Sequence, residues 1–155
     1  MTTMDTEVTL ALPIPNAEFI WYCAWTSFFS AIYAFSKDET AHFTAVPAAV
    51  LASSLNYWRN PVSNSWRRTI DIAVVFSGMT YQAYYLHNGY SNGLLKHSTW
   101  LTYVYLIGCS AICYGLGHYL MFHDCVWPAT YAHASIHIVA NIANFVLYNG
   151  YNTPK

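Results

Sequence analysis

The stretch HSTWLTYVYLIGCSAICYGLGHYLMFH, residues 97–123, contains no Asp, Glu, Lys or Arg. A helix needs roughly 17–25 mostly apolar residues to cross a bilayer, and this stretch satisfies that requirement. Four more charge-free stretches are long enough for the same purpose, and the charged residues stand between them: 19–36, 40–58, 72–95 and 125–154. The sequence therefore predicts an all-α, polytopic transmembrane helix bundle with about five spans.

The composition of the whole chain agrees with this prediction. Only 8% of the 155 residues are charged and 18% are aromatic, whereas soluble domains carry about 25% charge. A soluble helical bundle is the alternative, but charge-free runs of this length would leave such a bundle no solvated face. Strict two-residue alternation is absent, which favours helices over strands. The net charge of −1 gives no reason to expect nucleic acid as a partner.

The boundaries follow from the charges. We expect an N-terminal tail over 1–17, with no basic signal sequence, and a single transmembrane domain over 18–155 with spans near 18–36, 42–58, 69–87, 98–120 and 130–149. The loop at 59–68 holds three of the six Lys and Arg residues. The excess of positive charge in cytosolic loops then predicts a cytosolic N-terminus and a C-terminus outside or in the lumen.

The last expected span carries a polar stripe. His133, His137, Asn141 and Asn144 are spaced so that they share one helical face. Polar groups are costly in hydrocarbon, so this face is expected to point into the bundle, a cavity or a partner. Two histidines one turn apart can hold one metal ion. They can equally form hydrogen bonds with neighbouring helices.

Other polar residues are predicted to lie at the depth of this histidine pair. Ser53 and Ser54 come near the inner end of the second span, and Asp71 lies at the start of the third. His118 and His123 follow at the inner end of the fourth span. Considered alone, Asp71 is interpreted as an interfacial carboxylate near a helix N-terminus. The two serines, considered alone, are interpreted as packing residues. Their shared depth favours one common site.

The segment from Tyr131 to Val139, with its His-x-x-x-His, resembles the last helix of the CREST membrane hydrolase superfamily, which includes the alkaline ceramidases and the progestin and adipoQ receptors. That family also has Ser-x-x-x-His in its second helix and an Asp at the start of its third. The stretch 53–58, which begins with Ser53 and Ser54, and the residue Asp71 occupy these places here. Tyr57 and Trp58 stand where the family has histidine, and the family has seven spans rather than five.

The resemblance implies a zinc-dependent lipid hydrolase. His133 and His137 would bind zinc, with His118 or His123 as the third imidazole. Asp71 would orient or deprotonate the zinc-bound water, and Ser53 or Ser54 would stabilise the developing oxyanion. The substrate would be an amide or ester lipid that enters from the membrane.

Two other functions remain open from the sequence. A non-catalytic membrane subunit or scaffold would use the polar stripe to pack on partner helices, or would form a homo-oligomer. Ala111 and Gly115 form a small-xxx-small pair that suits close helix contact. A channel or transporter would use the histidines as a proton relay, but neither an inverted repeat nor a broken helix pair is visible.

Overall fold

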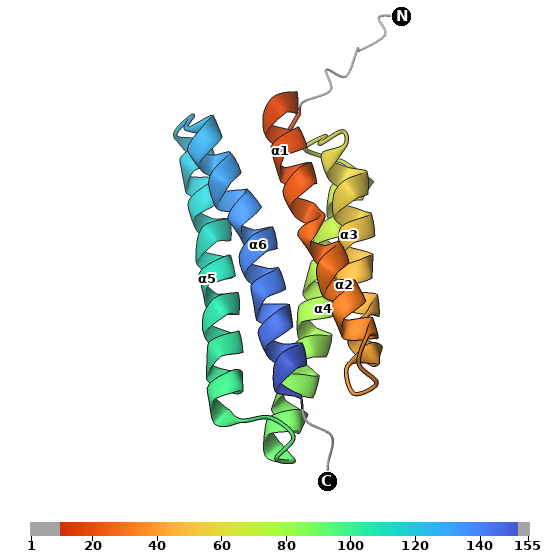
Figure 1. Ribbon diagram of the computed structural model, residues 1–155. Helices are drawn as coiled ribbons and strands as arrows, with labels where there is room; N and C mark the ends of the chain where they lie inside the picture. Colours follow the sequence, from red (N-terminus) through yellow and green to blue (C-terminus); the bar gives the residue numbers. More distant parts are fainter. Residues whose placement is uncertain (1–9, 152–155) are drawn as a thin grey trace, which may run out of the picture.

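The computed structural model describes residues 10–151 and is shown as a ribbon in Figure 1. The described residues are helical, with no strand and one isolated bridge between Leu10 and Val62. This confirms the predicted helical class. The elements in chain order are α1 (Ile14–Ala24), α2 (Thr26–Phe35), the short 3-10 helix η1 (Ala41–Phe43), α3 (Ala45–Trp58), α4 (Trp66–Ser91), α5 (His97–Phe122) and α6 (Val126–Gly150).

The first helix begins earlier than expected and is interrupted. It begins at Ile14, inside the stretch 1–17 that was expected to be a tail, because Pro13 and Pro15 stand where proline favours a helix start. Residues 1–9 of that stretch lie outside the described range. The break falls at Trp25, where the Thr26 hydroxyl donates to the Cys23 carbonyl at 2.7 Å. Local side-chain bonding of this kind competes with the helical ladder.

Helices α4, α5 and α6 extend past the expected spans, whereas α3 begins three residues later than expected, after η1. In particular, α4 begins at Trp66 rather than at 69, since the Ser65 hydroxyl accepts a hydrogen bond from the Arg68 backbone N–H at 3.3 Å and caps the helix. It ends before Gly93, whose φ of +72° suits the turn into α5. The turn between α5 and α6 uses Asp124 at φ 56°, a conformation that Asp tolerates better than most residues.

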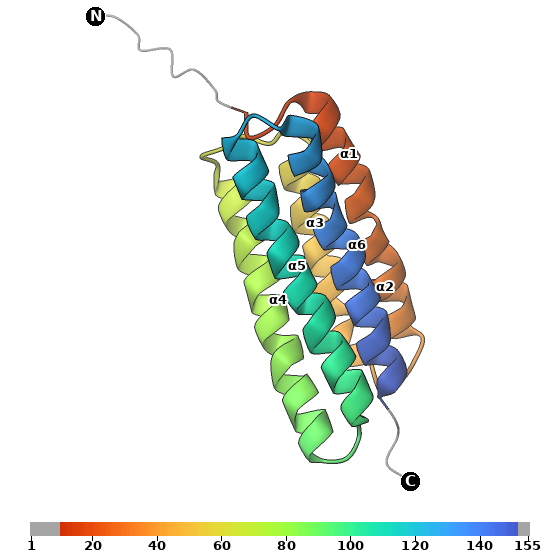
Figure 2. The same cartoon turned by 90° about the vertical axis from the view of Figure 1, so that its left-hand side faces the viewer.

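Helix α6 lies at the centre of the arrangement. It packs along α5 and also against α1 and α2, while α4 packs mainly on α3 and touches α5 only slightly. Figure 2 shows α5 and α6 running side by side. The upper end in Figure 1 brings together the start of α1, the end of α3, the start of α4, the end of α5 and the start of α6. We call this the site end of the bundle.

Much of the molecular surface is apolar. Large hydrophobic side chains are exposed on α1, α2, α4, α5 and α6, and they include Phe35, Tyr105, Ile112 and Phe122. Within residues 10–151, α5 is the one helix whose length and mean hydropathy of 1.3 qualify it as a candidate membrane span. The crossing of the bilayer by five segments therefore stays a prediction, although each expected span coincides with helical structure.

Candidate functional site

Two serines of α3 hold the carboxylate of Asp71. The Ser53 and Ser54 hydroxyls both donate to Asp71 Oδ1, each at 2.7 Å. No hydrogen bond reaches Oδ2 from the described residues. Hydrogen bonds to an ionised acceptor are short and about twice as strong as neutral ones. The paired serines therefore fix the position of Asp71 while leaving one oxygen available.

The local fold of α4 explains where Asp71 lies. Because the helix begins at Trp66, Asp71 stands in its second turn and faces α3. The neighbouring Arg68 uses its guanidinium to donate to the Ser63 carbonyl at 3.1 Å. Asp71 therefore lies near the N-terminus of α4, and its hydrogen-bond donors are serine hydroxyls from another helix.

One face of α3 also reaches the histidine pair. Trp58 follows Ser54 by one helical turn, and its ring lies edge-on to His133 with centroids 4.8 Å apart. The His133 and His137 rings are 6.0 Å apart. Ser54 and Trp58 thus connect Asp71 of α4 with the pair on α6. Helix α3 therefore contacts both Asp71 and His133, two of the residues that were predicted to lie at the same depth in the membrane.

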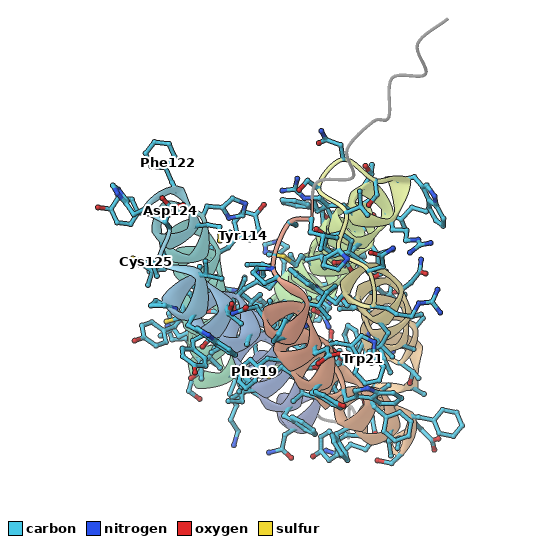
Figure 3. The ribbon with its side chains drawn as sticks, turned by 90° about the horizontal axis from the view of Figure 1, so that it is seen from above. Phe19, Trp21, Tyr114, Phe122, Asp124 and Cys125 are labelled. Atoms are coloured by element: carbon cyan, nitrogen blue, oxygen red, sulfur yellow. The ribbon has the colours of Figure 1, made fainter. Side chains whose placement is uncertain are left out.

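The two other histidines of the predicted site are exposed. His118 stacks on Tyr114 at 4.3 Å, and its Nδ1 lies 3.0 Å from the Tyr114 carbonyl. In Figure 3, which looks down on the site end, Tyr114 extends from α5 on the side that faces α3 and α4. His118 is an electrostatic neighbour of His133. His123 instead packs on Tyr119 at 4.5 Å and stands at the end of α5.

The residues present do not complete a catalytic zinc site. Such sites use three protein ligands and an open fourth position. His133 and His137 supply two imidazoles, and within residues 10–151 no group of three His, Cys, Asp or Glu is arranged to hold a metal. Trp58 packs on His133 beside this pair, and indole is a hydrogen-bond donor with no acceptor or metal-binding lone pair.

Two polar atoms at this place are buried without partners. The indole Nε1 of Trp58 and Nε2 of His137 have no hydrogen-bond partner, although the side chains are only 5% and 8% exposed. A buried donor or acceptor without a partner costs about 1–3 kcal/mol.

The other residues of the polar stripe form hydrogen bonds with neighbouring helices of the same chain. Asn141 donates to the hydroxyls of Thr26 and Ser27, both at 3.0 Å. Asn144 accepts from Gln82 Nε2 at 2.9 Å, and the Tyr148 hydroxyl accepts from the same nitrogen. These contacts join α2, α4 and α6 in the middle of the bundle.

Sequence reasoning did not identify Gln82 as a central residue. Its Oε1 also accepts from the Tyr103 hydroxyl at 2.9 Å, so one side chain of α4 bonds to both α5 and α6. The sequence offered one signal, a glutamine within the charge-free stretch 72–95. The structure shows that this side chain is buried. The role of Trp58 was also missed, since a Trp beside Arg59 is typical of an interface anchor.

No protein-family model, no curated protein and no solved structure matches this chain.

Proposed function

We propose that this chain is a multi-pass integral membrane protein that draws an amide or ester lipid into a hydrolase-like site at the site end of its bundle. The membrane part of the proposal is supported by the length of the helices. At about 1.5 Å per residue, α4, α5 and α6 each exceed the roughly 30 Å of a bilayer core. Their exposed aromatic and aliphatic side chains suit contact with lipid.

The proposed site rests on one observation: α3 contacts both α4 and α6. Ser54 bonds to Asp71 on α4, and Trp58 packs on His133 of α6. The three stretches that resemble the CREST hydrolases therefore lie together. Such convergence of a carboxylate, hydroxyls and imidazoles next to a lipid-facing surface suits chemistry on a lipid carbonyl.

Asp71 is the base in this proposal. Oδ1 is held by the two serines, and Oδ2 takes a proton from a water molecule that attacks the lipid carbonyl. The water oxygen forms the new bond to the carbonyl carbon, the bond to nitrogen or oxygen breaks, and the proton passes to the leaving amine or alcohol. Ser53 and Ser54 position the base, because their hydroxyl protons are already donated to it.

The test is release of fatty acid by the purified protein in lipid nanodiscs. The substrates are an N-acyl sphingosine and a phosphatidylcholine, each with a labelled acyl chain. We expect wild type to release labelled fatty acid and Asp71→Asn to lose at least 100-fold of that rate. Asp124→Asn is the matched control, because Asp124 is exposed at a turn and Asn tolerates its positive φ. Equal rates for wild type and Asp71→Asn would refute hydrolysis by this site.

A second function, a non-catalytic membrane subunit, is favoured by two observations. Trp58, which cannot bind a metal, packs on His133, and the small-residue pair on α5 faces outward. Ala111 is exposed, and a Cβ at Gly115 would meet no atom within 4 Å. A partner helix could approach α5 closely there. This function predicts association that is weakened by Gly115→Leu, with no release of fatty acid by wild type.

A further inference from the structure

The site end has a pocket that the proposed hydrolase site does not use. It lies between α1 and the end of α3, and its volume is about 220 Å³. Its lining residues are Ile14, Glu18, Trp21, Tyr22, Trp58 and Arg59. Figure 3 looks down on this end and shows Trp21 on the side of α1 that faces α3. Pockets for drug-sized molecules measure about 300–1,000 Å³, so this one suits a smaller group.

Two side chains of opposite charge line this pocket. Glu18 belongs to α1, and Arg59 is the residue at which α3 ends. Both are exposed, and within residues 10–151 neither side chain forms an ion pair or a hydrogen bond. A ligand with a single charge would meet a like charge here. A zwitterion can place each of its charges beside the opposite one, so the pocket favours a zwitterion.

Aromatic rings of α1 stand beside the carboxylate. Trp21 and Tyr22 follow Glu18 by three and four residues, which places all three on one helical face. The two rings pack edge to face with centroids 5.2 Å apart. Ring faces attract cations, and proteins use aromatic rings in this way to recognise quaternary ammonium groups. A carboxylate next to such rings therefore suits a trimethylammonium group.

The end of α3 supplies donors for an anion. The guanidinium of Arg59 can donate two parallel hydrogen bonds, a geometry that matches phosphate. Trp58 also lines the pocket, and its indole N–H has no partner among the described residues. Phosphate oxygens accept hydrogen bonds from donors of both kinds. The pocket thus has an anion-binding wall on α3 and a cation-binding wall on α1.

We propose that the pocket between α1 and α3 binds a phosphocholine group. The phosphate lies at Arg59, and the trimethylammonium group lies against Glu18 and the two α1 rings. The group can belong to a membrane phospholipid or to free phosphocholine. Tryptophan and tyrosine collect at the level of lipid head groups, which agrees with a pocket at one end of the bundle. This assignment does not depend on hydrolysis at Asp71.

The test measures the binding of short-chain phospholipids to the full-length protein in maltoside micelles by native mass spectrometry. The probes are a phosphatidylcholine, a phosphatidylethanolamine, which lacks the methyl groups, and a phosphatidylglycerol, which lacks the cation. We expect wild type to bind the choline lipid about 5–10-fold more tightly than either of the others. Displacement of the choline lipid by free phosphocholine would show that the group alone is recognised. A choline preference without displacement would assign the site to the phospholipid.

Two variants separate the two walls of the pocket. Arg59→Gln is expected to weaken binding of the choline lipid about 10-fold. Arg67→Gln is its matched control, because Arg67 lies near the start of α4 at the same end and does not line the pocket. Glu18→Gln is expected to abolish the preference for choline over glycerol. Glu39→Gln, which changes a residue between α2 and η1, is expected to keep that preference.

The comparison of the three lipids in wild type needs no variant, so a folding defect cannot hide the answer. Equal affinity of wild type for the three lipids would overturn the proposal. Equal weakening by Arg59→Gln and Arg67→Gln would also overturn it, because general attraction by surface charge would then explain the binding.

Discussion

Trp58 and His133 pack edge to face with ring centroids 4.8 Å apart, which fixes the end of α3 against the start of α6. Trp58 belongs to a buried cluster that also includes Ile20, Tyr57 and Ala134. Helices α1, α3 and α6 meet in this cluster. The same indole therefore stabilises the site end beside the histidine pair.

Trp58→Ala is expected to lower the free energy of unfolding by about 3–5 kcal/mol, because it leaves a cavity in a packed cluster. Reversible unfolding in mixed detergent micelles measures the change. Trp66→Ala is the matched control, since Trp66 is 65% exposed, and its effect is expected to stay within about 0.5 kcal/mol. Equal effects of the two substitutions would mean that Trp58 is not buried.

The serine–aspartate contact is expected to show coupling. Ser54→Ala should cost about 1.5–3 kcal/mol of stability, since it removes one hydrogen bond to a charged acceptor. Asp71→Leu alone should cost more, because it leaves two serine hydroxyls without their acceptor. The double variant should cost less than the sum of the single variants, by 0.5 kcal/mol or more. Strict additivity in the same unfolding assay would show that the two side chains do not interact.

Gln82 is expected to be the most sensitive polar residue in the middle of the bundle. Gln82→Ala leaves Asn144, Tyr148 and Tyr103 without their partner, so we expect a loss of about 2–4 kcal/mol. Thr80→Ala, two residues away and exposed, is the control. The change is measured as a lower midpoint temperature for the thermal loss of the near-ultraviolet circular dichroism signal. A Gln82 variant as stable as the Thr80 variant would refute the network.

Five spans predict that the two chain ends lie on opposite sides of the membrane. The described ends agree in direction, since α1 begins at the site end and α6 ends at the other (Figure 1). Tags at the N-terminus and at the C-terminus, probed with an impermeant reagent in sealed vesicles, should react from different sides. Reaction of both tags from one side would exclude an odd number of crossings.

The helices were predictable from the sequence because charge-free stretches make up most of their length, and a charged side chain in hydrocarbon is costly. The interruption at Trp25 was not predictable, because it depends on a local bond from the Thr26 hydroxyl. The early start of α4 depends on the N-terminal cap by Ser65. The length of a charge-free stretch does not indicate such a cap.

The site was predictable in part. The shared depth of Ser54, Asp71 and His133 followed from the order of the spans, because successive helices return to the same end. Orientation about a helix axis did not follow. Spacing alone could not tell that His118 is exposed beside Tyr114, or that Trp58 fills the space next to His133.

Zinc content of the detergent-purified protein tests the central claim most directly: that the site formed by α3, α4 and α6 works with Asp71 as its base and without a zinc ion. Purification avoids chelators, and wild type is compared with Trp58→His and with His133→Ala/His137→Ala. The account predicts no more zinc in wild type than in the double variant, and about one zinc per chain in Trp58→His, which restores three imidazoles. About one zinc per chain in wild type, lost in the double variant, would contradict it.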